Sequence, residues 1–286
     1  MVDKVVPIPN KVIVQAAVGN ERKHAAHFLI RGRLSRRADW AISLLGLLTL
    51  LTLWCLLTYT EFVQRSFLPT PTAIVDGLIE FHRRNWLFPA IWRSTTRVVT
   101  ALLLVIGIGM PIGILIGAFA PFDAFLRKIV NGGKAVPTSA LLGLVVLWAG
   151  LDDTAKIVFL FLGSIFYMII LVKNAILGVN EEYLRVALDL GANRWQMIWR
   201  VLLPGAVPQI WGAIAVCSGI MWTYIVLAEF INSSQSNLGV GYLLFVGSRT
   251  GGNGAGKIFG MIIVIALISS LTDFLLQFVR KKLFDW

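Results

Sequence analysis

The chain has 286 residues, of which 57% are hydrophobic and 14% are charged, and its formal net charge is +11 at pH 7. So large an apolar fraction with so few charges excludes an ordinary soluble domain and predicts an integral membrane protein. The positive charge suggests nucleic-acid binding, but the basic residues gather beside apolar segments, so we expect no nucleic-acid partner. Cys55 and Cys217 both fall inside apolar segments, and we interpret them as small buried hydrophobes.

Residues 1–39 are polar and basic, and we assign them to a cytoplasmic N-terminal segment with a surface-lying helix over residues 21–37. A secretory signal is a poorer interpretation, because the first long apolar run starts late and lacks a small-residue cleavage pattern. The basic residues of this segment favour a cytoplasmic amino terminus.

Six apolar segments follow, and each is about long enough to cross a hydrocarbon core of roughly 30 Å. With the amino terminus inside, most of the 26 lysines and arginines fall in cytoplasmic segments, which places the carboxyl terminus inside as well. We expect Arg97, near the outer end of the second segment, to snorkel outward. The sequence therefore predicts an all-α integral membrane protein with six transmembrane helices and both termini in the cytoplasm. The predicted spans are Trp40–Tyr59, Ser94–Phe119, Ile129–Gly150, Ala155–Leu177, Val207–Phe230 and Ile258–Phe278.

Between the first two spans, a proline turn over Leu68–Thr72 predicts the start of a short interfacial helix over Ala73–His82. The second span carries glycines at four-residue spacing, a pattern that predicts close helix packing rather than chemistry. These glycines are Gly109, Gly113 and Gly117.

The third span opens with an irregular stretch, Asn131–Ser139, which contains two glycines, a lysine and a proline. Irregular backbone at this depth is tolerated where protein buries it or where it lines a wet cavity. The stretch therefore predicts a broken helix start and residues that line a translocation pathway. The alternative is a kinked helix with its lysine among the inner headgroups. The pathway candidates here are Lys134, Pro137, Thr138 and Ser139.

The fifth span is the most polar of the six. A carboxylate within a span costs about 2.5–3.5 kcal/mol at mid-helix, so an intramembrane acid is a candidate functional residue. Glu229 lies near the outer end, however, where a structural partner such as Arg97 or Arg249 would suffice. The alternative for Ser218 and Thr223 is a hydrogen bond to the carbonyl four residues earlier. The pathway candidates in this span are Ser218, Trp222, Thr223 and Glu229.

Asn180–Pro208 forms a polar island whose pattern predicts a helix, a glycine and a second helix. Asn180 is a predicted N-cap, Gly191 ends the first helix, and the second begins near Asn193. Pro204 is expected to break or kink the second helix. Two short amphipathic helices between spans predict either a docking surface or an ordinary interhelical connection. Their predicted apolar faces are Leu184, Ala187 and Leu188 in the first, and Trp195, Ile198, Trp199 and Leu202 in the second.

This stretch resembles the EAA loop in the membrane subunits of ATP-binding cassette importers. The family pattern is Glu-Ala-Ala, three residues, Gly, nine residues, Ile, one residue, Leu-Pro. Here Arg185 and Val186 replace the Glu and the first Ala, and Val201 replaces the Ile, while the spacing is intact. In the family this loop is the coupling helix that sits in a groove of the cytosolic ATPase. The resemblance implies that the ATPase-coupling residues are Arg185, Val186, Ala187, Gly191, Ala192, Leu203 and Pro204.

Further segments are similar to the branch of the family that contains nitrate, bicarbonate, sulfonate and taurine permeases. They are Leu68–Thr72, Ala135–Thr138, Ala228–Glu229 and Leu238–Leu244. The resemblance implies a type I importer permease fold in three parts: the basic segment 1–39, the first transmembrane helix and outer interfacial helix 40–89, and a permease core 90–283. The core would contain the cytoplasmic coupling loop 180–208.

The resemblance also implies a division of labour. The chain would be a non-catalytic permease subunit in the lipid bilayer of the bacterial inner membrane, paired with a second copy as a homodimer. A periplasmic or lipid-anchored binding protein would deliver a small anion, and cytosolic ATPase subunits would bind ATP and magnesium, with no cofactor in this chain. Two other classes stay open: a secondary transporter or channel independent of ATP, and a membrane scaffold that only recruits a partner.

No catalytic residues or metal site are expected. Gly251–Lys257 fits the spacing of a phosphate-binding loop, but Ile258 follows where Ser or Thr is needed for magnesium, so we exclude an ATP site. The histidines have no carboxylate or cysteine set that would complete a metal site. Asp152 and Asp153 are expected to cap the fourth helix.

Overall fold

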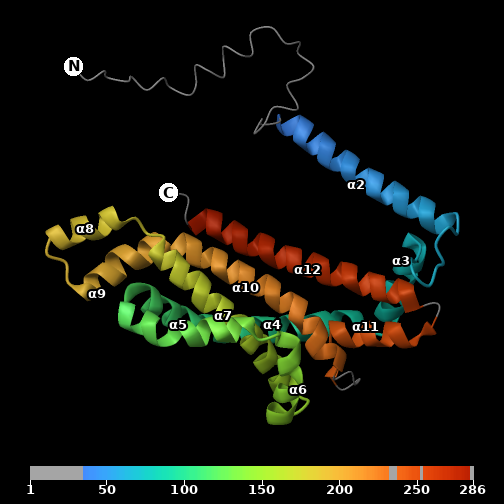
Figure 1. The fold of residues 1–286 in the computed structure, drawn as a ribbon. Coiled ribbons are helices and arrows are strands. Elements are labelled where there is room, and N and C mark those ends of the chain that lie inside the picture. Colours follow the sequence, from blue (N-terminus) through green and yellow to red (C-terminus); the bar gives the residue numbers. More distant parts are fainter. Residues whose placement is uncertain (1–34, 232–236, 252–253, 284–286) are drawn as a thin grey trace, which may run out of the picture. The chain divides into compact units, whose positions relative to one another are not determined.

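The computed structural model describes residues 35–231, 237–251 and 254–283, and all the regular structure in this part of the chain is helical (Figure 1). Five helices are long and apolar enough to cross a membrane, or six if one sharply bent pair counts as a single span. The prediction of an all-α membrane protein is therefore confirmed. The chain divides into two compact units, Met1–Leu57 and Thr58–Trp286, which we describe separately.

The first unit contributes most of α2 (Arg36–Tyr59), which corresponds to the predicted first span. Its central residues are almost all leucine, threonine and other neutral side chains, and a candidate span runs over Arg37–Tyr59. The predicted surface helix over residues 21–37 falls almost entirely outside the described residues.

The core of the second unit is built from α4 (Leu87–Ala118), α7 (Asp153–Leu177) and α10 (Leu203–Ile231). The spaced glycines of α4 face α7. A Cβ atom at Gly113 would lie 2.8 Å from Val172 Cβ, and one at Gly117 would lie 2.8 Å from Ile176 Cβ. Small residues at this spacing let two backbones approach closely in lipid, so the predicted packing role is confirmed.

The third predicted span is a bent pair rather than one helix from Ile129. It consists of α5 (Ala120–Ala135) and α6 (Thr138–Ala149), which meet at 97°. The break lies at Val136 and Pro137, whereas Gly132 and Gly133 are helical. The reason is that a proline excludes the residue before it from the helical region, and Val136 is extended, with φ −70° and ψ 126°.

Helices α3 (Pro71–Arg83) and α11 (Val240–Arg249) pack near one end of the core. Helix α12 (Gly254–Leu283) contacts both of them and also runs along α10, where Trp211 Nε1 donates a hydrogen bond to the Leu276 carbonyl. Helix α3 confirms that a short helix forms here, with Ile74 and Phe81 buried, and its place at the membrane interface stays a prediction. Helix α11 was not predicted. Within Gly251–Lys257, Gly256 has a packing role, because a Cβ there would collide with the Ala73 carbonyl of α3.

Candidate functional site

The predicted coupling loop begins with α8 (Glu181–Asp189), whose ends are closed by local hydrogen bonds. Asn180 Oδ1 accepts from the Glu182 N–H at 3.0 Å, as expected of an N-cap. At the other end Gly191 has φ +77°, and its N–H donates to the Leu188 carbonyl at 2.9 Å. The next N–H, of Ala192, donates to the Ala187 carbonyl at 2.9 Å. This pair of bonds is a Schellman motif, so the prediction that α8 ends at this glycine is confirmed.

The second half of the loop is α9 (Arg194–Met197), which is closed by a capping box. Asn193 and Gln196 exchange side-chain to backbone hydrogen bonds of 2.9 Å in both directions. A π-helical turn, η2 (Ile198–Leu202), follows and leads directly into α10. Of the two alternatives for Pro204, the break is therefore wrong, because helical structure runs without interruption from Arg194 to Phe230, and the kink stays a prediction. The Leu203 N–H bonds five residues back, to the Ile198 carbonyl, so the chain has already widened before the proline.

The loop exposes more apolar surface than the predicted faces implied. Leu184 packs against the core, but Leu188, which was predicted to lie on the same face, is 55% exposed. Ile198 and Leu202 are buried while the two tryptophans predicted to share their face are not. Exposed apolar patches outside the membrane spans mark interaction sites, so the loop has the composition of a contact surface. Its exposed large apolar side chains are Tyr183, Val186, Leu188, Leu190, Trp195 and Trp199.

The residues assigned to ATPase coupling lie on or beside this surface. Arg185 is 76% exposed, and its Nη2 lies 3.5 Å from Glu181 Oε2 on the preceding turn. Val186, Gly191 and Pro204 are exposed, and Ala187, Ala192 and Leu203 are half-buried. Their role in coupling stays a prediction, and the geometry places all of them within one helix–glycine–helix segment.

A buried ionic cluster lies around Arg97, in α4. Its Nη1 is 2.5 Å from Glu229 Oε1 in α10, and its Nη2 is 2.6 Å from Asp153 Oδ1 in α7. The Arg97 side chain is 2% exposed and that of Glu229 is 0% exposed. The expectation that Arg97 snorkels outward is thus wrong: two carboxylates hold the guanidinium inside. Asp153 binds Arg97, and the N-cap residue of α7, Asp152, makes no side-chain capping bond.

Glu229 has the structural partner that the sequence offered as an alternative. Besides Arg97, its carboxylate accepts hydrogen bonds from Ser94 Oγ at 2.7 and 2.8 Å. Since the side chain has no exposed surface, its predicted place in the pathway finds no support in this conformation and stays a prediction.

The other pathway candidates form two groups, one at the break between α5 and α6 and one along α10, and a hydrogen bond joins α6 to α10 near them. Thr138 Oγ1, at the start of α6, donates to the Tyr224 hydroxyl of α10 at 3.3 Å. On α10, Ser218 and Trp222 are buried, and Ser218 Oγ and Trp222 Nε1 have no hydrogen-bond partner among the described residues. Thr223 is exposed and bonds back to the Gly219 carbonyl at 3.2 Å. The back-bonding alternative is therefore observed for Thr223 and not for Ser218. The exposed remainder of the first group is Lys134, Pro137 and Ser139.

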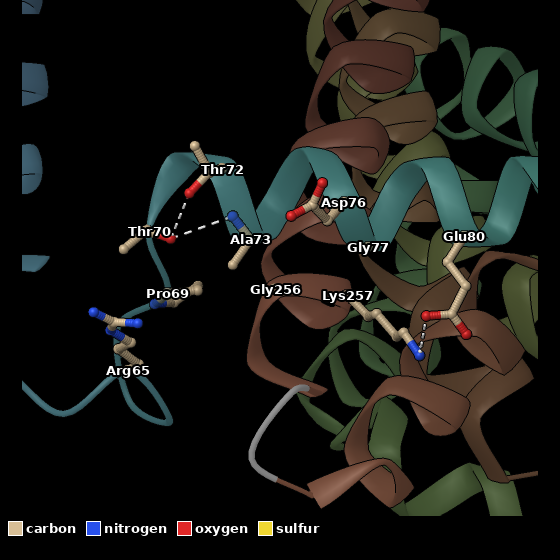
Figure 2. A pocket seen from close by; sticks show the side chains of 10 residues that line it. All are labelled: Arg65, Pro69, Thr70, Thr72, Ala73, Asp76, Gly77, Glu80, Gly256 and Lys257. Carbon is tan, nitrogen blue, oxygen red and sulfur yellow. Dashed lines mark hydrogen bonds and ion pairs between the residues drawn. The ribbon is translucent and has the colours of Figure 1, made fainter. Parts of the chain in front are cut away.

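An open pocket of about 400 Å³, which was not predicted, lies between α3 and the first turn of α12 (Figure 2). Lys257, which is 7% exposed, reaches from α12 to Glu80 of α3 with Nζ 2.7 Å from Oε2. This hydrogen bond is the main cause that lowers the pKa of the Glu80 carboxyl below its usual value. Arg65 and Asp76 also line the pocket. The Lys257–Glu80 bond fixes α3 to α12.

A family model for the inner membrane component of binding-protein-dependent transport systems matches residues 109–285. The chain belongs to this family. The match covers α5 to α12, with the coupling loop near its centre. It confirms the resemblance drawn from the loop and makes the chain a permease subunit of an ATP-binding cassette importer, a multi-pass protein of the plasma membrane.

Two relatives cover almost the whole permease. It is 29% identical over 274 residues to the taurine transport system permease protein TauC of Escherichia coli, covering 93% of this chain and 96% of the relative. It is 32% identical over 251 residues to the putative aliphatic sulfonates transport permease protein SsuC of Bacillus subtilis, covering 88% and 89%. A structure of the MetNI methionine ABC transporter in an inward-facing conformation matches with a TM-score of 0.60 at 20% identity. That match covers 69% of this chain and 94% of the other, and it confirms the type I importer permease fold.

Proposed function

We propose that this permease imports a small organic sulfonate such as taurine, or a related small anion, that a separate binding protein delivers. The names of the two relatives that cover most of its length support this substrate class. The energy would come from ATP bound with magnesium on a cytosolic ATPase. We further propose that two copies of the chain form the translocation pathway as a homodimer.

The observation that carries the proposal is the exposed coupling loop between α7 and α10. These two helices pack against each other in the core, and the loop that joins them presents exposed apolar side chains and an exposed arginine. An ATPase that closes on ATP would push on α8. Because α7 and α10 continue directly from the loop, that push would tilt both helices. The tilt would switch the translocation pathway between inward-facing and outward-facing states by rigid-body rocking.

Within this proposal, residues at the break between α5 and α6 and residues along α10 line the pathway once two copies face each other. The candidates are Lys134, Pro137, Thr138 and Ser139 at the bent pair, and Ser218, Trp222 and Thr223 along α10. Ser218 and Trp222 support this assignment because a buried hydroxyl and indole N–H without a partner are costly unless a ligand or water meets them.

Uptake by the complete importer in proteoliposomes tests the proposal. The permease is reconstituted with its ATPase and binding protein, and uptake of labelled taurine, an alkanesulfonate, nitrate and bicarbonate is measured with and without internal ATP. We expect ATP-dependent uptake of taurine or the alkanesulfonate. Uptake that proceeds equally without ATP, or that follows an ion gradient alone, would contradict the coupling mechanism.

A further inference from the structure

The N-terminus of α11 is capped by side chains from two other helices. Its N-cap residue is Gly239, which has no side chain to offer. The Val240 N–H donates instead to Ser94 Oγ of α4 at 3.0 Å, and the Gly241 N–H donates to Glu229 Oε2 of α10 at 2.9 Å. Two N–H groups that a helix start leaves unsatisfied are thus bound by α4 and α10, and the Glu229 carboxylate lies at the positive end of the α11 dipole.

Two glycines make this approach possible. A Cβ atom at Gly241 would lie 2.6 Å from Glu229 Cβ and 2.7 Å from the Val226 carbonyl oxygen. A Cβ at Gly239 would overlap the Glu229 carboxylate. The glycines therefore serve to seat the first turn of α11 directly on Glu229.

The same carboxylate belongs to the ionic cluster that joins α4, α7 and α10. Arg97 connects Glu229 to Asp153, and Lys156 Nζ lies 3.6 Å from Asp153 Oδ1. Two cations and two carboxylates balance the charge of the cluster. Four helices thus meet at one hydrogen-bonded cluster, in which Arg97 and Glu229 are buried and Asp153 is 55% exposed.

This cluster lies at the opposite end of the second unit from the coupling loop. In Figure 1, α8 and α9 lie at one end of α7 and α10, and α11 lies at the other. Helix α7 begins at Asp153, in the cluster, and ends at Leu177, just before α8. Helix α10 begins at Leu203, after η2, and ends at Ile231, just past Glu229. Each of the two helices therefore links the coupling loop to the cluster.

We propose that the cluster of the buried Glu229, Ser94 and Arg97 with the more exposed Asp153 is the connection that makes α11 move as one body with the coupling loop. A ten-residue helix is marginal alone, so α11 is held in place by its buried apolar side chains and by these capping groups together. Glu229 and Ser94 are positioning residues in this scheme: they transmit the tilt of α7 and α10 to α11 at the far end. The inference rests on the proposed function.

The test measures uptake and ATP hydrolysis together in the reconstituted importer, per assembled complex, with the compound that the wild-type complex transports. Ser94→Ala removes the hydroxyl that binds Glu229 and the Val240 N–H. Thr96→Ala is the matched control, because Thr96 is exposed on the same helix and its hydroxyl bonds only to the Arg93 carbonyl among the contacts seen. We expect Ser94→Ala to lower uptake per ATP hydrolysed about tenfold, the scale of one buried unsatisfied group, and Thr96→Ala to leave it unchanged.

Glu229→Gln is the second variant and is expected to give the same loss while hydrolysis continues. If both variants reduce the amount of complex but keep wild-type uptake per ATP, the cluster is merely structural and the proposal is wrong. If the wild-type importer itself shows no ATP-dependent uptake of any compound tested, the proposed function and the connection are both overturned.

Discussion

Replacing Arg97 by methionine is the sharpest test of the buried cluster as a source of stability. The change leaves the Glu229 carboxylate fully buried with two of its partners, Ser94 Oγ and the Gly241 N–H, but without the cation that is bound directly to it. Unit charges about 4 Å apart interact by about 4 kcal/mol at an effective dielectric constant near 20. Removing one partner of a buried pair costs about 3–5 kcal/mol. Since the two remaining donors offset part of this, we expect a loss of about 3 kcal/mol in the free energy of unfolding.

Reversible unfolding in mixed detergent micelles measures this free energy for Arg97→Met, Glu229→Gln and the double variant. The double variant removes both charges, so it should recover at least about half of the loss of the Arg97→Met variant. Arg93→Met is the matched control, because Arg93 is exposed on the same helix. Equal destabilisation by the single and double variants, or a single-variant loss below about 1 kcal/mol, would refute the reasoning.

Three further predictions concern other parts of the permease. Gly191→Val should abolish ATP-coupled uptake while membrane insertion, followed by immunoblotting of membranes, stays normal; φ +77° excludes a β-branched residue, whereas Gly191→Asn tolerates this conformation and should retain uptake. Gly113→Ala should destabilise the protein by about 1–3 kcal/mol in the detergent unfolding assay, because its Cβ would lie 2.8 Å from Val172 Cβ, while Gly107→Ala, with open space around it, should cost nothing. The Glu80 carboxyl has a folded-state pKa below its ordinary value near 4.5, so its contribution to stability is present above that value and is lost as the pH falls through the folded-state pKa. As the pH falls from 6 to 3, the melting temperature of Glu80→Gln should therefore decrease less than that of the wild type. An equal decrease in both proteins would count against the Lys257–Glu80 bond.

Hydropathy and local capping signals predicted most of the spans and the coupling loop. Apolar length identified α2, α4, α7, α10 and α12 because each is continuous in sequence. The ends of α8 followed from Asn180 and Gly191, whose hydrogen bonds close within six residues along the chain. Apolar length and helix caps depend on neighbouring residues in the chain, so both can be predicted from one sequence.

The buried cluster depends on contacts between distant parts of the chain. The sequence offered Arg97 as one partner for Glu229 and also as a snorkelling residue, and only the fold decides between them, since the two residues are 132 positions apart. Helix α11 was missed because its segment has no clear apolar period, and its first turn is held by Ser94, 146 positions away from Val240. The glycines at 239 and 241 were the available signal: they mark a close approach by another group, but not which group.

The two tryptophans of the coupling loop are exposed because a π-helical turn follows α9. Trp195, Ile198, Trp199 and Leu202 have the spacing of one face of an α-helix, and the sequence predicted that they would share one apolar face. The π-helical turn over Ile198–Leu202 places more residues in each turn than an α-helix does, so the two pairs separate around the axis. Ile198 and Leu202 then face the core, while Trp195 and Trp199 are 64% and 63% exposed. Because the same turn precedes Pro204 and keeps the helix continuous into α10, a partner that binds the tryptophans acts on α10 without an intervening break.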